Sequence, residues 1–144
     1  MEVGKFLMLG IITDDVEKSV ESFKQFGFQD WNIEKFDSDF IPDVLLNNEP
    51  GRLVFIGAQY RSQNINIELL QPVSESIYMD YLRSHGPGVH HMEFEPKDGY
   101  ETFMRDYRAA GHDVLLEADF AGGKAGFAFL DTEKLLGFRL EIHK

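Results

Sequence analysis

Residues 86–94 read Gly86-Pro87-Gly88-Val89-His90-His91-Met92-Glu93-Phe94, a sharp turn followed directly by a strand-forming segment. The Gly-Pro-Gly run is typical of a turn, and the residues after it predict a strand over 89–95. From this strand onward, the chain repeats the order of elements with which it began. The stretch therefore marks the beginning of a second structural module in the same chain.

The first half has the order strand, helix and three strands. Apolar residues 6–12 predict a buried strand, and Asp14, with Glu17 three residues later, is expected to cap a helix that stops at Gly27. The remaining strands are expected over 28–36, 53–57 and 64–70. A long acidic loop is expected over 37–51, a turn over 60–63, and Pro72 ends the last strand.

The second half repeats this order after a connecting helix. Asp98, with Glu101 three residues on, is expected to cap a helix that stops at Gly111. Further strands are expected over 113–116, 127–130 and 138–143, with a glycine-rich loop over 119–126. We therefore predict an α+β fold in which two βαβββ modules form a curved mixed sheet around a central pocket. Module one spans about residues 4–72, the helix about 74–84 and module two about 88–144, in a single domain.

Composition excludes several classes of function. The 144 residues include 25 acidic and 14 basic side chains, giving a formal charge of −11, which disfavours nucleic acid and anionic membranes as partners. Cysteine is absent, so disulfides, thiolate nucleophiles and cysteine-bound zinc are excluded. The apolar run 6–12 is too short for a membrane span and has no signal-peptide features. We expect a cytoplasmic protein by default.

Three polar side chains interrupt apolar strands. Glu68 lies between Ile67 and Leu69, His91 follows His90, and Glu141 lies between Leu140 and Ile142. Alternation places Glu68, His91 and Glu141 opposite the helix-facing side chains. One imidazole and two carboxylates could bind a divalent metal. The alternative is that each simply faces solvent, as polar residues of alternating strands commonly do.

The sequence resembles the vicinal oxygen chelate superfamily, in particular its glyoxalase-like and methylmalonyl-CoA epimerase-like members. The resemblance rests on four stretches that span nearly the whole chain, namely residues 9–18, 67–72, 86–94 and 126–132 leading to 140–142. The family's second, third and fourth metal-ligand positions fall on Glu68, His91 and Glu141. The resemblance implies a site for zinc, nickel, manganese, cobalt or iron(II), with Glu141 or Glu68 as the catalytic base.

One metal-ligand position departs from the family pattern. The family's first ligand is a histidine, but Met8 occupies that position here, and a thioether is a poor ligand for these metals. Three readings therefore stay open. The first is a lyase or isomerase that uses metal-assisted proton transfer beside a carbonyl, and the second is a metal-free, resistance-type binding protein. The third is a metal-free isomerase with Glu141 or Glu68 as its base. A dioxygenase is disfavoured, because only one pocket histidine is evident.

Further residues are candidates for substrate binding. These are Met8, Arg52, Arg139 and Glu93, where Arg139 shares a strand face with Glu141 and Glu93 shares one with His91. Salt bridging on an acidic surface is the alternative for both arginines, and solvent exposure is the alternative for Glu93. His90 is expected on the opposite face in a structural role, and His143 at the surface. The resemblance also implies a homodimer with a small-molecule substrate.

Overall fold

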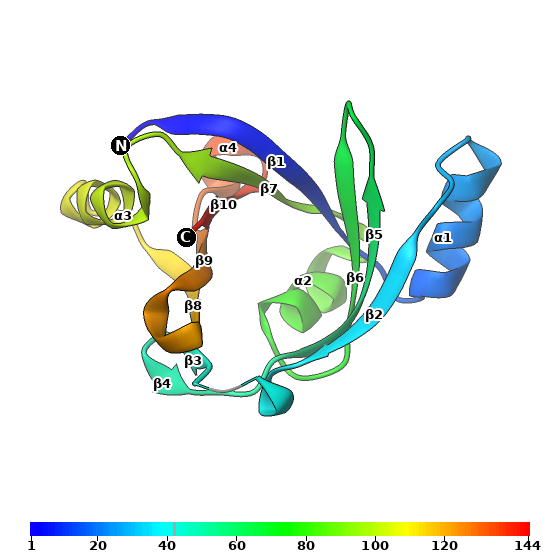
Figure 1. The fold of residues 1–144 in the computed structure, drawn as a ribbon, viewed down its shortest axis with the longest axis horizontal. Coiled ribbons are helices and arrows are strands. Elements are labelled where there is room, and N and C mark those ends of the chain that lie inside the picture. The colour runs from blue at the N-terminus through cyan, green and yellow to red at the C-terminus, as the bar shows by residue number, and fades with distance from the viewer. Residues whose placement is uncertain (42) are drawn as a thin grey trace. The chain divides into compact units, whose positions relative to one another are not determined.

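The computed structural model describes residues 1–41 and 43–144, so Pro42, inside the loop predicted over 37–51, lies outside the described residues (Figure 1). The strands are β1 (Val3–Ile12), β2 (Asn32–Asp37), β3 (Leu45–Leu46), β4 (Glu49–Pro50), β5 (Val54–Arg61), β6 (Asn66–Pro72), β7 (Gly88–Pro96), β8 (Val114–Phe120), β9 (Ala125–Leu130) and β10 (Arg139–His143). The helices are α1 (Val16–Gln25), α2 (Ile77–His85), α3 (Tyr100–Ala109) and α4 (Glu133–Leu136), with short 3₁₀ turns η1 (Ser38–Phe40) and η2 (Ala121–Gly123).

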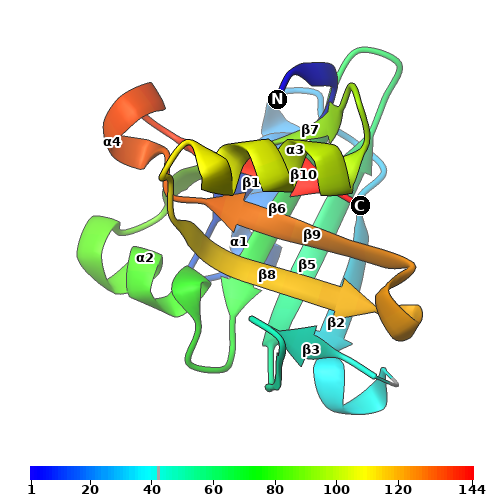
Figure 2. The same ribbon diagram turned by 90° about the vertical axis from the view of Figure 1, so that its left-hand side faces the viewer.

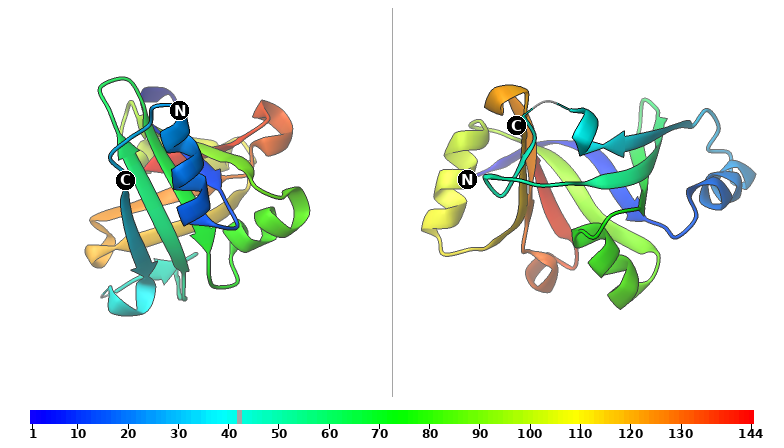
Figure 3. Two further views of the ribbon diagram at one scale, coloured as in Figure 1. Left: turned by 90° about the vertical axis from the view of Figure 1, so that its right-hand side faces the viewer. Right: turned by 90° about the horizontal axis from the view of Figure 1, so that it is seen from below.

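The first compact unit, here called the β6 unit, consists of Met8–Ser38 and Arg52–His90. Its strands follow the order β2-β5-β6-β1, with β1 parallel to β6 and the other pairs antiparallel. Helix α1 covers one face of this sheet (Figure 3, left). Its core is formed by buried residues of α1, β5 and β6, namely Val16, Val20, Ala58, Ile67 and Leu69.

The second compact unit, here called the β10 unit, consists of Met1–Leu7, Asp39–Gly51 and His91–Lys144. Its strands follow the order β7-β10-β9-β8-β3-β4, with β10 parallel to β7 and the other pairs antiparallel. Helix α3 lies across one face (Figure 2). The core joins four α3 side chains to buried residues of β9 and β10: Tyr100, Phe103, Met104, Tyr107, Ala128, Leu130, Leu140 and Ile142.

The predicted repeat is present in the strand order. In both modules the second, third, fourth and first strands lie side by side in that sequence, β2-β5-β6-β1 in one and β8-β9-β10-β7 in the other. The first and fourth strands are parallel each time, as the intervening helix allows. The α+β class, the mixed sheet and the two βαβββ modules are thus confirmed.

Both predicted helix caps are wrong by one residue. Helix α1 is capped by Asp15, whose carboxylate accepts a hydrogen bond from Lys18 N at 3.0 Å, and not by Asp14. Thr13 moves the cap, because its hydroxyl oxygen accepts from Asp15 N at 3.2 Å and orders the preceding turn. The residue that directly precedes helix α3 is Gly99 and not Asp98. Gly99 has φ +83°, a conformation that glycine adopts more easily than other residues.

The loop predicted over 37–51 contains regular structure. Asn47 and Asn48 both have positive φ, +53° and +65°, and they join β3 to β4 in a two-residue hairpin. Asparagine tolerates this conformation, so the Asn-Asn pair is a turn signal that sequence reasoning overlooked. Strand β3 then pairs with β8, and Asn47 N donates to Glu117 O at 2.8 Å. This hairpin therefore covers what would otherwise be the exposed edge of β8.

Other strand bounds differ as well. The turn predicted over 60–63 begins within β5, which continues to Arg61 and pairs with β6 along its length. The strand predicted over 28–36 begins only at Asn32, because residues 28–31 pack Phe28 and Trp31 against Tyr60. The short helix α4 was not predicted. None of the helices that the structure describes combines the length and the apolar character needed to cross a membrane.

Gly126 offers a direct test of the β8–β9 pairing. A Cβ atom at this position would lie 2.2 Å from Ala118 O, a backbone atom that cannot move without shifting β8. We expect Gly126→Ala to lower the free energy of unfolding by about 1–3 kcal/mol, as overpacking does. The measurement is urea unfolding followed by circular dichroism. The matched control is Gly57→Ala in β5, whose Cβ would meet its nearest neighbour at an ordinary 3.4 Å; equal losses in both variants would contradict the packing described.

Candidate functional site

His91 and Glu141 meet in the β10 unit on the sheet face opposite α3. The parallel register sets Arg139 beside His91 and Glu141 beside Glu93, so alternation turns these four side chains to the same face. His91 Nε2 lies 3.2 Å from Glu141 Oε2. The two side chains are only 1% and 8% exposed, which excludes the solvent-facing alternative for both.

The imidazole of His91 is neutral at ordinary pH. Burial, together with the nearby Arg139 guanidinium, lowers the pKa of His91 from its usual 6.5 to about 3. Its ring also packs edge-on against Phe129, with centroids 4.9 Å apart. A neutral ring nitrogen 3.2 Å from a carboxylate oxygen can accept a proton or bind a metal ion, which an imidazolium cannot.

Glu93 and Arg139 extend this cluster to both sides. Glu93 is buried, and its Oε1 lies 2.8 Å from Nδ1 of the half-exposed His143, so the solvated position considered from sequence is wrong. Arg139 Nε lies 3.4 Å from Glu133 Oε2 in α4. Carboxylate, imidazole and guanidinium groups therefore share one largely buried patch of the β7–β10 pair.

His90, next in sequence to His91, has the structural role expected for it. Its side chain is buried in the β6 unit, edge-on to the rings of Tyr78 and Tyr81 at 5.4 and 4.9 Å. Period-two alternation thus turns the two adjacent histidines to opposite faces of the strand. His90 packs against aromatic rings, and His91 contacts a carboxylate.

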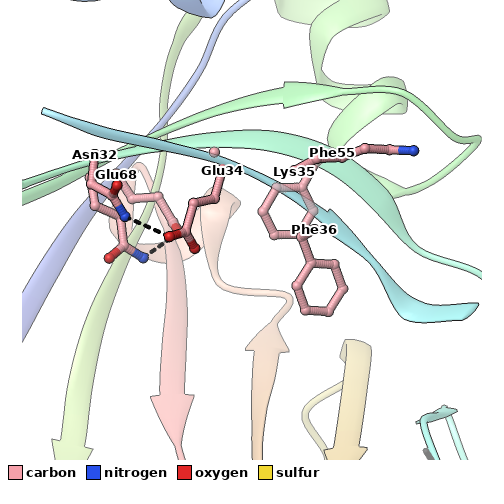
Figure 4. Close-up of a pocket in the computed structure, with 8 residues that line it drawn as sticks. Asn32, Glu34, Lys35, Phe36, Phe55 and Glu68 are labelled. Atoms are coloured by element: carbon pink, nitrogen blue, oxygen red, sulfur yellow. Dashed lines mark hydrogen bonds between the residues drawn. The ribbon is translucent and has the colours of Figure 1, made fainter. Parts of the chain in front are cut away.

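Glu68 lies in the β6 unit on the face opposite α1. Its Oε1 accepts a hydrogen bond from Gln59 Nε2 at 3.2 Å, across the β5–β6 register pair. Both residues line an open groove (Figure 4). Other lining residues, from β2 and β5, include Asn32, Glu34, Phe36 and Phe55.

The first strands of the two modules differ at two equivalent positions. In β1, Gly10 is the register partner of Glu68, and in β7, Glu93 is the register partner of Glu141. Two residues earlier stand Met8 in the first module and His91 in the second. Methionine therefore occupies, by register, the position from which the second module supplies its imidazole.

The predicted site residues thus fall into three places. His91, Glu141, Arg139 and Glu93 come together in the β10 unit, while Met8 and Glu68 belong to the β6 unit. Arg52 is exposed, and its guanidinium lies 3.3 Å from Asp37 Oδ2. This is the salt bridge considered from the sequence as the alternative to substrate binding. Within either unit taken by itself, the described residues hold no group of three His, Asp or Glu side chains placed to bind a metal ion.

Sequence reasoning missed the groove residues Asn32, Glu34 and Gln59. Gln59 was overlooked because the turn was placed at residues 60–63, which hid the alternation of β5. Read with the observed bounds, Gly57, Gln59 and Arg61 alternate with Ala58 and Tyr60, and that pattern identifies the groove face.

The protonation of His91 predicts a pH dependence of stability. The unfolded chain binds a proton at His91 below about pH 6.5, but the folded chain does so only near pH 3. Stability therefore falls as the pH drops through this window, by about 1.4 kcal/mol per pH unit, and is unaffected above it. We expect the free energy of unfolding in urea to fall with this slope in wild type, relative to the same measurement on His91→Gln. A difference between the two proteins that stays constant from pH 4 to 8 would contradict a buried neutral imidazole.

The chain has recognisable relatives. A comparison with curated proteins found no match. Among solved structures, it is similar to methylmalonyl-CoA epimerase from Mycobacterium tuberculosis, with 16% identity, a TM-score of 0.69, and 98% and 87% of the two chains covered. It is similar to the Streptomyces coelicolor epimerase in complex with 2-nitronate-propionyl-CoA, with 20% identity, a TM-score of 0.68, and 99% and 97% covered.

A third structural relative is a hypothetical protein from Bacillus halodurans C-125, with 22% identity, a TM-score of 0.66, and 96% and 92% of the two chains covered. These likenesses establish the fold. The model of one protein family matches residues 9–130, which is most of the chain and includes both modules. With the repeated strand order already described, this match shows that the chain belongs to the Glyoxalase/Bleomycin resistance protein/Dioxygenase superfamily.

Proposed function

We propose that the protein is a small-molecule isomerase or lyase that moves a proton beside a carbonyl group, with Glu141 as the base. The observation that carries this proposal is the buried contact of 3.2 Å between Glu141 and the neutral ring of His91. Buried titratable pairs of this kind are characteristic of functional sites. Membership of the superfamily and the likeness to epimerases support the same reaction class.

The chemistry follows from the surroundings of Glu141. A carboxylate that removes a proton from carbon must be held in place and kept from water, and Glu141 is 8% exposed and fixed on a central strand pair. The neutral imidazole of His91 adds no competing positive charge to the carboxylate. Arg139 lies on the same strand face, and its guanidinium can stabilise the negative charge that develops on a substrate oxygen.

The donor atoms of this pair also fit a divalent metal. Two ligands that bind one ion at about 2.0–2.2 Å lie about 3 Å apart, close to the 3.2 Å between His91 Nε2 and Glu141 Oε2. His91 and Glu141 would hold the ion, which would supply Lewis-acid polarisation of substrate oxygens. Inclusion of Glu68 as a third ligand and as a second base stays a prediction from the sequence.

A second candidate function is metal-free binding of a small molecule. Met8 favours it, because the first module presents a thioether where the second presents an imidazole. Zinc, nickel, manganese, cobalt and iron(II) all bind imidazole better than thioether in such sites. The homodimer and the cytoplasmic location expected from the sequence remain proposals.

Deuterium exchange tests the proposed base. We expect the protein to catalyse exchange of the proton beside the carbonyl in ²H₂O for methylmalonyl-CoA or for the hemithioacetal of methylglyoxal and glutathione. Glu141→Gln should slow the exchange by about 10²- to 10⁴-fold, because the amide cannot accept the proton. The measurement is ¹H NMR of the substrate over time. Glu101→Gln, at an exposed α3 carboxylate, is the matched control and should react like wild type. Exchange that survives intact in Glu141→Gln would refute the role of Glu141.

Metal content tests whether a metal assists the proposed function. After dialysis against zinc, nickel, manganese, cobalt or iron(II), we expect about one ion per chain by inductively coupled plasma mass spectrometry, and loss of it in His91→Ala. Glu68→Ala tests the third ligand. Met8→His should strengthen retention, because it restores an imidazole to the first module. Wild-type protein that holds no metal under any of these conditions would contradict metal assistance and leave metal-free proton transfer or metal-free binding, which the exchange experiment separates.

A further inference from the structure

We propose that Phe129 is a positioning residue for the proton transfer, and that its ring holds the imidazole of His91 against Glu141. This role rests on the proposed function and deepens it, because it belongs to a side chain that neither accepts a proton nor binds a metal. The place of the Phe129 ring carries the proposal, since the ring borders both members of the buried pair.

Phe129 lies on β9 and points to the same sheet face as the pair. It is the antiparallel register partner of Glu141, so the two side chains stand next to each other on neighbouring strands. Its ring lies edge-on to the imidazole of His91, with centroids 4.9 Å apart and planes 62° apart. Phe129 and His91 are each only 1% exposed. One buried ring therefore contacts the imidazole and flanks the carboxylate.

The ring contact can fix the orientation of the imidazole. A histidine ring turns about the bond that joins it to Cβ, and this torsion has broad minima. The distance of 3.2 Å from His91 Nε2 to Glu141 Oε2 requires one orientation of the ring. Edge-to-face packing is directional, because the edge of one ring is attracted to the face of the other. Phe129 thereby favours the orientation in which Nε2 points at the carboxylate.

The first module has an amide where the second has this phenyl ring. Glu68 and Glu141 both lie on the fourth strand of their module, and the register partner of Glu68 on the third strand is Gln59. Gln59 Nε2 donates to Glu68 Oε1 at 3.2 Å. A phenyl ring has no such donor. The third-strand neighbour of Glu141 therefore does not compete with His91 for the carboxylate.

The same ring shields Glu141 from water. The Glu141 side chain is 8% exposed, and Phe129 supplies apolar surface on one flank of it. A carboxylate without a hydration shell removes a proton from carbon more readily, because it has no water to shed first. A smaller side chain at this position would admit water, and a polar one would donate a hydrogen bond. Either change would weaken the base.

Neighbouring side chains keep Phe129 in place. The ring of Phe127, two residues earlier on the same face, lies edge-on with centroids 5.3 Å apart and planes 68° apart. Leu116 of β8 is the register partner of Phe129, and this pairing follows a shift of register between Val114 and Leu116. A bulge of this kind re-aims a side chain, and such bulges are frequent beside active sites. Here the shift sets Leu116 beside Phe129.

The alternative is that Phe129 only fills the core. The α3 core of the β10 unit lies on the opposite sheet face and includes Ala128 and Leu130, the two sequence neighbours of Phe129. Phe129 points away from that core and toward His91. A purely structural side chain would change stability on substitution but not the rate at saturating substrate. Kinetics therefore separates the two roles.

The first test measures deuterium exchange in Phe129→Leu and Phe129→Gln, with circular dichroism to show that each variant is folded. Leucine keeps an apolar side chain but removes the ring, and glutamine places the first module's amide beside Glu141. We expect kcat to fall about tenfold in Phe129→Leu and about 100-fold in Phe129→Gln, with KM changed by less than about threefold. Phe103→Leu, which removes a buried ring from the α3 core, is the matched control and should lower stability but keep kcat.

The second test needs no substrate and uses protein dialysed free of metal. In ¹⁵N NMR, the His91 ring of wild type should show one tautomer, with the hydrogen on the Nε2 that faces Glu141. Phe129→Gln should move these signals toward the average of both tautomers, because the amide competes for the carboxylate, and Phe103→Leu should leave them unchanged.

Full kcat in both Phe129 variants would overturn the positioning role, and so would His91 signals that are unchanged in both. Either result, with Glu141→Gln still inactive, would leave the proposed function in place. If wild type catalyses no exchange, the proposed function fails instead, and the His91 signals alone decide whether Phe129 holds the imidazole.

Discussion

The parallel pairing of the first and fourth strands in each module is the constraint on which the rest of the structure depends. It requires a helix between the first and second strands, and that helix must bury one face of the sheet. The other face is then free for polar side chains. In the β10 unit this pairing sets β7 beside β10, and the register brings His91 and Glu141 to within 3.2 Å.

The two modules share one strand order but carry different side chains at equivalent positions. Both fourth strands carry a glutamate on the face away from the helix, Glu68 in one module and Glu141 in the other. The first strands differ, with Met8 where the second module has His91. The second module thereby gains a buried imidazole–carboxylate pair suited to proton transfer or metal binding. The first module instead surrounds its glutamate with amides, a second carboxylate and stacked rings.

Sequence patterns predicted what depends on alternation and on strong turn signals. The Gly86-Pro87-Gly88 turn lies between α2 and β7 as predicted, and period-two alternation separated His90 from His91 correctly. Positions that depend on a competing local hydrogen bond were not predictable in the same way, as the shift of the cap from Asp14 to Asp15 shows. The burial of Glu93 beside His143 could not be read from the chain, because it depends on the register between β7 and β10. The groove depended on a strand boundary at Arg61, and a misplaced turn concealed it.

His91 is a buried, neutral partner of Glu141, and ¹⁵N NMR of the histidine rings measures its protonation state. We expect one imidazole that stays neutral from pH 8 down to about pH 4, whose ring nitrogen signals shift in Glu141→Gln. His91→Gln assigns that ring by removing it. A His91 ring that titrates near its ordinary pKa of 6.5, with signals unchanged in Glu141→Gln, would show that the buried neutral pair does not exist.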